Sequence, residues 1–423
     1  MKVFKFGGAS INSVERIQNV AKILHDYKDE KILIVISAMG KMTNAFEKVA
    51  EEFYAGKKED ALLLFEKIKQ NHLTTLKYTI TQQWEKAGNE LQNFFTEIEW
   101  MLHDKPVKEY DYYYDQIVCI GELLSTTILS FYLNEEKIVN KWIDVRDVLR
   151  TDDNFRDASI DWIVTGKNVE EKIIPLFNET NIVVTQGFIG ATDENESTTL
   201  GREGSDFTAA IFANILNAES VTIWKDVDGI MNADPKDFED AITIAGLSYK
   251  EVIEMAYYGA QVIHPKTIKP LQNKNIPLYV KSFLNKQLPG TVITQKHPHN
   301  LPPIIVYKRN QVLITLESKD FSFVEGKPVN TLYEILNQVK VKPNLTQNTA
   351  ISLFVCMDDI AGKIEQIALQ AEEIFDVQLE KDLTLLTIRH YTNEFVQKLS
   401  ENKIIVLEQK ILDTIQLLMR EVN

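Results

Sequence analysis

The sequence predicts an α/β protein, in which a layered domain with a largely parallel sheet precedes a smaller α+β region. Short apolar strands alternate with helical patterns from residue 1 to about 295, an order typical of parallel sheets. The strand predicted over 31–36 is apolar at successive positions, as strands buried on both faces are. Beyond a Pro-rich run at 296–303, the chain changes to short strands and amphipathic helices.

With 423 residues, the chain is long enough for two or three domains. We expect a first domain over 1–295, a linker over 296–305 and a second region over 306–423. Within the second region a β-α-β-β order is expected twice, which is a weak internal repeat. Residues 44–106 are predicted to form a polar helical cap over one end of the first domain's sheet.

Composition excludes several classes of partner. A formal net charge of -15 argues against nucleic acid and anionic membranes, and the apolar runs fall short of a membrane span. The chain starts with a strand and lacks a signal-peptide pattern, so a cytoplasmic protein is expected. Cys119 and Cys356 each lie in an apolar run and are expected to be buried thiols.

The first candidate site is the stretch Lys2–Ser10, a strand that ends at the glycine pair Gly7-Gly8 before a helix. Paired glycines let the backbone approach a ligand, and the next helix directs its N–H groups there. Lys5 stands where a cation could reach a phosphoryl group. No Walker A loop is present, and this stretch alone fits an ordinary turn equally well.

A second glycine turn, Gly201–Asp206, opens an apolar helix over 207–216. Arg202 could grip a carboxylate with two hydrogen bonds, and Asp206 could organise Lys5 or a metal-bound phosphate. The alternative is that Ser205 or Asp206 only caps the helix.

A third cluster, Asp226–Gly229, follows a strand and leads to Lys236. It matches only part of a calcium loop, and an edge loop that touches a nucleotide fits better, with Lys236 as a phosphate ligand. His264 has no metal-ligating neighbours at ligand spacing and is expected to be structural.

Together these clusters resemble the amino acid kinase family, and within it the aspartate kinases. The resemblance rests on motifs that follow the family order over roughly the first 290 residues: 5–8, 37–44, 121–123, 185–190, 199–206, 226–229 and 258–265. It implies a three-layer αβα domain of the carbamate-kinase-like type. It also implies two ferredoxin-like ACT regulatory domains in the tail.

The resemblance implies transfer of the ATP γ-phosphoryl group to the side-chain carboxylate of L-aspartate, the first step towards lysine, threonine and methionine. Lys5 would stabilise the phosphoryl group in transfer and Asp206 would hold that lysine. Arg202 would grip the α-carboxylate and Glu122 the α-ammonium. The expected aspartate pocket is Ser37, Ala38, Thr43, Glu122, Phe188, Arg202 and Ser205. A carboxylate nucleophile is already ionised, so no general base is needed.

For the nucleotide, the resemblance implies ATP with Mg²⁺ on its phosphates, and no protein metal cluster. The residues expected to face ATP are Lys5, Gly7, Gly8, Lys225, Asp226, Met231, Lys236 and Gln261. Four positions depart from the commonest family pattern, namely Glu203, Lys225, Met231 and Gln261. We hypothesise that Lys225 supplies the charge that Gln261 lacks.

The resemblance of the tail to ACT domains implies that lysine or threonine regulates the enzyme by feedback. It also implies that the protein forms at least a homodimer. Its expected effector loop, Asp320–Pro328, lacks the usual Gly-Phe signature, so a purely structural dimerisation module is the alternative. Two other readings of the whole chain stay open. One is a kinase acting on glutamate or N-acetylglutamate, and the other is a catalytically silent amino-acid-binding regulator.

Overall fold

The computed structural model describes residues 1–298 and 300–422, so position 299 of the predicted linker and the C-terminal residue lie outside the described residues. The chain forms two compact units. The first comprises 1–230, 243–253 and 262–298, and the second comprises 231–242, 254–261 and 299–423. Two segments of the predicted first domain thus belong to the second unit. The predicted boundaries at 295 and 306 remain a prediction.

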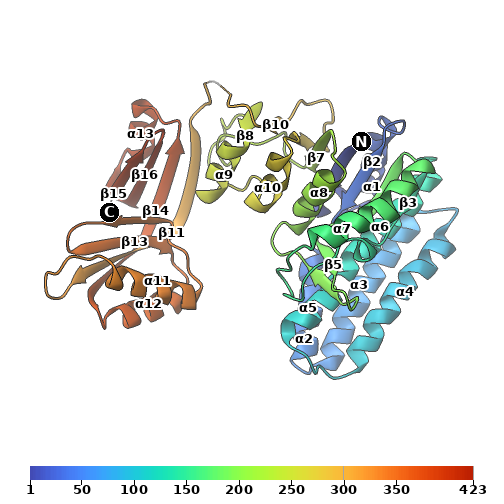
Figure 1. Cartoon of the computed structure of the whole chain (residues 1–423), viewed down its shortest axis with the longest axis horizontal. Coiled ribbons are helices and arrows are strands. Elements are labelled where there is room, and N and C mark those ends of the chain that lie inside the picture. Colours follow the sequence, from blue (N-terminus) through green and yellow to red (C-terminus); the bar gives the residue numbers. More distant parts are fainter. Residues whose placement is uncertain (299, 423) are drawn as a thin grey trace. The chain divides into compact units, whose positions relative to one another are not determined.

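An eight-stranded sheet is the centre of the first unit (Figure 1). Its strand order is β3-β4-β2-β1-β7-β9-β10-β8, and every neighbouring pair is parallel except β9 with β10. All five residues of β2 are buried, so both faces of the sheet are covered there. The prediction of a largely parallel sheet is confirmed. The strands are β1 (Lys2–Phe6), β2 (Ile32–Ile36), β3 (Asn140–Trp142), β4 (Ile182–Gln186), β7 (Ser220–Lys225), β8 (Gly246–Ser248), β9 (Leu278–Ser282) and β10 (Thr291–Thr294).

Four central strands end at one edge of this sheet. The register pairs Phe6 with both Ile36 and Trp224, and Ile36 with Gln186. The turns that follow β1, β2, β4 and β7 therefore meet at the carboxyl edge, where α/β sheets bind ligands.

Glycine permits two of these turns to touch their neighbours. A Cβ atom on Gly8 would lie 2.6 Å from the carbonyl oxygen of Ala38, and one on Gly187 would lie 2.5 Å from the Cβ of Ser205. Any larger residue would push the turns apart, because neither neighbouring group can move away freely.

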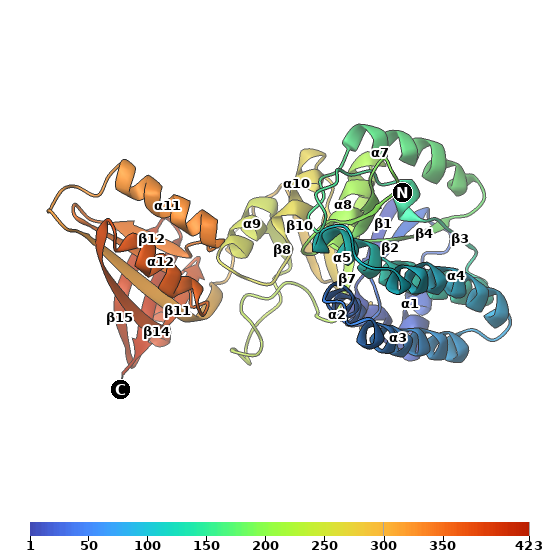
Figure 2. The ribbon, with the colours of Figure 1, turned by 90° about the horizontal axis from the view of Figure 1, so that it is seen from below.

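The helices of the first unit pack on this sheet and on each other. α6 packs on β2 and β4, and α8 packs on β1, β2 and β7. The prediction that residues 44–106 are helical is confirmed by α2, α3 and α4, with α3 and α4 side by side (Figures 1 and 2). These helices pack on one another, and α3 also packs on α1 and α6. The helices are α1 (Val14–His25), α2 (Met42–Tyr54), α3 (Lys58–Thr79), α4 (Trp84–His103), α5 (Tyr110–Val118), α6 (Ile120–Glu135), α7 (Trp162–Asn168), α8 (Gly204–Ile215) and α10 (Pro265–Asn273). A further helix, α9 (Tyr249–Tyr257), is divided between the two units at residue 254.

One stretch, Tyr110–Glu135, is long and apolar enough to cross a membrane. It comprises α5 and α6, and 89% of its most apolar window is buried inside the structure. It therefore behaves as a core helix, and Cys119 at its centre is a buried free thiol, as is Cys356 in the second unit.

The second unit is built on a six-stranded antiparallel sheet with the order β12-β13-β11-β14-β16-β15. The expected repeat is confirmed, because β11-α11-β12-β13 and β14-α13-β15-β16 share one order and α12 joins them. This arrangement is consistent with paired ACT-like domains. The elements are β11 (Ile304–Ser318), α11 (Lys327–Val339), β12 (Leu345–Asn348), β13 (Ser352–Asp358), α12 (Lys363–Ala371), β14 (Phe375–Arg389), α13 (Asn393–Ser400), β15 (Lys403–Ile411) and β16 (Thr414–Glu421).

Each half of this sheet has its own core. Val312, Ile314 and Leu316 of β11 pack with α11 and α12, while Leu386 and Ile388 of β14 pack with α13. β11 begins at Ile304, inside the range predicted as linker, because its first residues pair with the end of β14.

Candidate active site

A cleft of about 500 Å³ lies at the carboxyl edge of the first unit's sheet. Side chains from the ends of β1 and β7, from the turn after β2, and from helices α2, α5, α6 and α8 meet there. Lys5 and Arg202, the two cations predicted to bind the substrates, both line this cleft. The lining residues are Lys5, Ser37, Thr43, Tyr114, Glu122, Arg156, Phe188, Thr199, Gly201, Arg202, Glu203, Gly204, Ser205, Asp206 and Lys225.

A buried ion pair forms the base of the cleft. Lys5 Nζ lies 2.5 Å from Asp206 Oδ1, and the two side chains are 11% and 4% exposed. Burial alone would raise the pKa of Asp206, but Lys5, with Lys225 next in effect, outweighs burial and holds that pKa below its ordinary value. Asp206 therefore stays ionised and fixes the ammonium group of Lys5 at the cleft.

The first turn of α8 joins the turn after β2. Ser37 Oγ donates a hydrogen bond to Ser205 Oγ at 2.9 Å. Neither Ser205 nor Asp206 caps α8, because the N-cap residue is Glu203 and no side chain makes a capping bond. The alternative of a simple capping role is therefore wrong, and both side chains are available to the cleft.

Glu122 is a buried carboxylate with an unused oxygen. Its Oε1 accepts a hydrogen bond from the N–H of Ala38 at 3.3 Å, whereas Oε2 has no partner among the residues that the structure describes. Burial raises the pKa of Glu122 to about 8, against the opposing effect of the Ala38 N–H. A buried carboxylate without a full set of partners is costly, so this site is suited to a cationic ligand.

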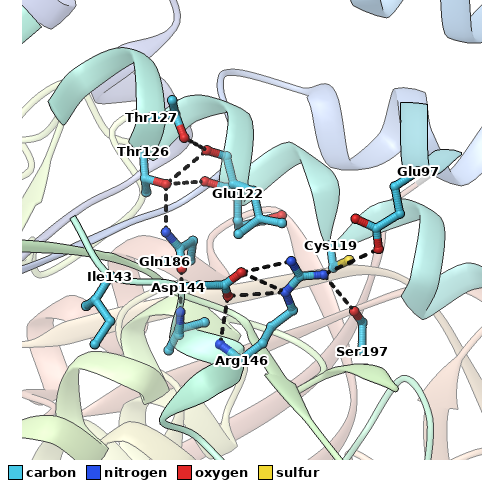
Figure 3. A network of polar contacts seen from close by, with 12 residues as sticks. Glu97, Cys119, Glu122, Thr126, Thr127, Ile143, Asp144, Arg146, Gln186 and Ser197 are labelled. Carbon is cyan, nitrogen blue, oxygen red and sulfur yellow. Dashed lines mark hydrogen bonds and ion pairs between the residues drawn. The ribbon is translucent and has the colours of Figure 1, made fainter. Parts of the chain in front are cut away.

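A polar network behind Glu122 fixes its helix (Figure 3). Thr126 Oγ1 donates to the carbonyl oxygen of Glu122 at 2.9 Å and accepts from Gln186 Nε2 at 2.8 Å. Gln186 Oε1 in turn accepts from the N–H of Val145 at 2.6 Å. The start of α6 is thereby tied to the end of β4, which sets where Glu122 enters the cleft.

Next to this network, Asp144 binds Arg146 through both carboxylate oxygens, at 2.8–3.1 Å. Arg146 also donates to Ser197 Oγ at 3.3 Å and faces Glu97 at 3.7 Å (Figure 3). This half-buried ion pair holds the loop after β3 against β6 (Ser197–Thr199).

The turn Gly201–Gly204 presents Arg202 to the cleft. Arg202 is exposed and makes no ion pair with any described residue, so its guanidinium is available to an anion. Glu203 adopts a left-handed backbone with φ of 55°, and its Oε2 accepts the N–H of His264 at 2.9 Å. The carboxylate of Glu203 therefore binds the backbone N–H of His264, next to the site proposed for an anion. His264 is the N-cap of α10, which confirms its structural role.

The remaining predicted residues divide between the two units. Ala38 contributes its N–H to Glu122, and the Cβ that Gly7 lacks would lie 3.3 Å from Lys5 Nζ. Asp226 is exposed directly after Lys225 at the end of β7. Three residues predicted to face ATP lie in segments of the second unit, so their nucleotide contacts remain a prediction: Met231, Lys236 and Gln261.

Two residues of the cleft are absent from the sequence-based prediction, namely Tyr114 of α5 and Arg156 of a loop. Thr199 of β6 lies within the predicted motif 199–206, but no role was assigned to it. The one usable signal was the aromatic-acidic pattern of 110–115, which is compatible with many helix surfaces.

Comparison with known proteins supports this description. The sequence pattern of the amino acid kinase family matches residues 1–282. The chain belongs to the amino acid kinase family. Its fold is also that of E. coli aspartokinase III, with a TM-score of 0.83 and 26% identity for the complex with lysine and aspartate, over 99% of this chain and 95% of that one. The complex of the same enzyme with aspartate and ADP gives a TM-score of 0.82 and 27% identity, over 99% and 96%.

Within the family, the chain falls among the aspartokinases. It is 30% identical to chloroplastic aspartokinase 3 of Arabidopsis thaliana over 403 residues, which is 91% of this chain and 71% of that protein. It is 31% identical over 380 residues to a chloroplastic bifunctional aspartokinase/homoserine dehydrogenase of the same plant, covering 88% of this chain. The chain spans only 39% of the length of that bifunctional relative.

Proposed function

We propose that this protein is an aspartate kinase that transfers the γ-phosphoryl group of ATP to the side-chain carboxylate of L-aspartate. The product is 4-phospho-L-aspartate, from which lysine, threonine and methionine are made. The observation that carries the proposal is the cleft that holds the Lys5–Asp206 pair, the free guanidinium of Arg202 and the half-paired carboxylate of Glu122.

The acceptor has one complementary group for each of its charges. Arg202 would bind the α-carboxylate through two hydrogen bonds, and Glu122 Oε2 would accept the α-ammonium. The side-chain carboxylate would then point towards Lys5. Ser37, Ala38, Thr43, Phe188 and Ser205 would complete the aspartate pocket; of these, all but Ala38 line the cleft.

The transfer needs positioning and charge stabilisation, and no general base. The attacking carboxylate is ionised at neutral pH, and it forms a bond to the γ-phosphorus as the bond to the ADP oxygen breaks. Negative charge on the phosphoryl oxygens is stabilised by Lys5, which Asp206 holds in place. An intact Lys5–Asp206 pair favours a catalyst over a silent amino-acid-binding regulator.

ATP would bind along the glycine turn after β1 and the end of β7, with Gly7, Gly8, Lys225 and Asp226 near its phosphates. Mg²⁺ would neutralise the phosphate charge when bound. Such an ion is held mainly by the phosphates and one or two carboxylates. The residues present fit that mode, because the carboxylate of Asp226 is exposed directly after Lys225 at the end of β7.

The proposal is tested by incubating the protein with ATP, Mg²⁺ and hydroxylamine, which traps acyl phosphates as hydroxamates. Aspartate should give hydroxamate together with ADP. Glutamate or N-acetylglutamate as the better acceptor would indicate another amino acid kinase. No product with any of the three would favour the silent regulator.

The ionisation of Glu122 should control the KM for aspartate. Below its pKa of about 8 the carboxyl is mostly neutral and cannot pair with the α-ammonium. The KM should therefore fall as pH rises from 6 to 8, by about tenfold per unit at the lower end, and then level off. In Glu122→Gln the KM should be high and independent of pH. Initial rates across this range, at saturating ATP, test the prediction; a flat wild-type profile would contradict it.

Lys225 should affect ATP more than aspartate. Its Nζ donates to the carbonyl oxygen of Val262 at 3.0 Å, and its charge is felt by Asp206 within the cleft. We expect Lys225→Ala to raise the KM for ATP by about tenfold, since one cation near the phosphates is lost, with little change for aspartate. Steady-state kinetics with each substrate varied check this, and an unchanged KM for ATP would discard the role.

The second unit is proposed to bind lysine or threonine as an effector. The E. coli aspartokinase III structure at TM-score 0.83 is a lysine complex, which supports lysine first. Millimolar lysine should then inhibit hydroxamate formation. No inhibition by lysine, threonine or both would leave the unit as a purely structural dimerisation module. We further propose that the protein is cytoplasmic and forms a homodimer or higher homo-oligomer. Light scattering of the purified protein would check the oligomeric state.

A further inference from the structure

The buried carboxylate of Asp115, on α5, has no role in the chemistry above. Its side chain is 0% exposed, yet three donors converge on it. Oδ2 accepts the N–H of Arg156 at 3.0 Å and the N–H of Thr199 at 2.8 Å, and Oδ1 accepts the hydroxyl of Thr199 at 2.7 Å. Both partner residues line the cleft.

Asp115 thus joins two segments that are far apart in the sequence. They are the loop around Arg156 and the turn that begins at Thr199. The same segments touch directly. The N–H of Ala158 donates to the carbonyl oxygen of Thr199 at 3.0 Å, and a Cβ on Gly201 would lie 3.2 Å from the carbonyl oxygen of Arg156. The turn that carries Arg202 therefore rests on this loop.

The backbone of the loop is itself under constraint. Arg156 has a φ of 69°, a left-handed conformation that is unfavourable for a non-glycine residue and persists only where surrounding contacts enforce it. Its guanidinium lies 4.3 Å from the ring centroid of Tyr114 and donates to Asp111 at 3.1 Å. A strained residue held by a buried carboxylate at the edge of a cleft indicates a shape that function requires.

We propose that Asp115 is a positioning residue for the acceptor: it holds the Arg156 loop and the Thr199–Arg202 turn in one register, so that Arg202 faces the α-carboxylate of the substrate. Arg156 itself forms part of the wall of the cleft, beside the turn that its loop supports. The inference rests on the proposed function, because the acceptor is the one named there. Neither Asp115 nor Arg156 takes part in the phosphoryl transfer itself.

Three variants of the full-length chain test the contact between Asp115 and its two partner segments. Asp115→Asn keeps the shape but loses the charge, and Thr199→Val removes only the hydroxyl donor. Each should raise the KM for aspartate by about 10-fold, as loss of a hydrogen bond to a charged group does, with the KM for ATP within about twofold of wild type. Asp115→Ala should lower kcat/KM for aspartate by about 100-fold.

A fourth variant separates the side chain of Arg156 from its backbone. Arg156→Gly keeps the left-handed backbone and the N–H donor to Asp115 but removes the guanidinium, and it should raise the KM for aspartate about fivefold. Asn195→Gly is the matched control, because Asn195 also has a positive φ, 63°, in an exposed turn. It should leave both KM values unchanged.

A merely structural role gives a different result. If Asp115→Asn and Thr199→Val lower the melting temperature but leave the KM for aspartate within twofold of wild type, the positioning role is overturned. Thr199→Val keeps this outcome accessible should the Asp115 variants fail to fold. Failure of the proposed function is distinguishable, since the wild-type protein would then form no aspartyl hydroxamate at all.

Discussion

Lys5→Met is expected to lower kcat by about 10³-fold, with KM values changed much less. Cations that face a phosphoryl group in transfer contribute most where water is excluded, and removal of such a group costs two to five orders of magnitude in related chemistry. Lys5 is 9% exposed and its ammonium is fixed by Asp206, so no solvent cation replaces it at the same place. Single-turnover and steady-state rates of ADP formation measure the loss.

A control on the same strand is available for this variant. Lys2 is also on β1 and forms an ion pair with Glu30, away from the cleft lining. Lys2→Met should leave kcat unchanged. Asp206→Asn should resemble Lys5→Met, and the double variant should be little worse than either single one, because the two residues act as a unit. Additive losses would contradict the paired role.

Arg202→Met is expected to raise the KM for aspartate by about 100-fold. The variant loses a bidentate, charge-assisted contact, worth roughly 3 kcal/mol within a partly closed site. Arg202→Lys should recover only part of this loss, since an ammonium group cannot match a carboxylate with two parallel donors. The measurement is the KM for aspartate at saturating ATP.

Lys141→Met provides the control for surface charge, because Lys141 of β3 forms an exposed ion pair with Glu179. It should not change either KM. A rise in the KM for ATP that equals the rise for aspartate would contradict the assignment of Arg202 to the acceptor. It would instead indicate general disorder of the turn that opens α8.

The location of the cleft was predictable from the sequence because parallel strands place their carboxyl ends at one edge. Lys5, Ser37, Phe188 and Lys225 all stand at or just after such ends, so their proximity follows from the strand pattern. Arg202 was predicted from the glycine turn that opens α8, and Glu122 came from the family motifs. Neither strand pattern nor motif determines how completely Glu122 is buried, which is what raises its pKa.

The wall formed by Arg156 could not be predicted in the same way. Its link to Thr199 depends on the buried carboxylate of Asp115 on α5, and an Asp that directly follows the tyrosines of 110–114 carries no such signal. The segment 231–242 is a second example. Its Phe238 stacks on Tyr307 of β11, a long-range contact that local periodicity does not encode.

The most direct test of the central claim is a crystal structure of the protein with ADP, a planar phosphoryl mimic and aspartate. We predict that Lys5 Nζ contacts the mimic and that two guanidinium nitrogens of Arg202 contact the α-carboxylate of the same bound aspartate. Aspartate bound away from Arg202, or a mimic that Lys5 does not reach, would contradict the claim that the two cations serve one reaction.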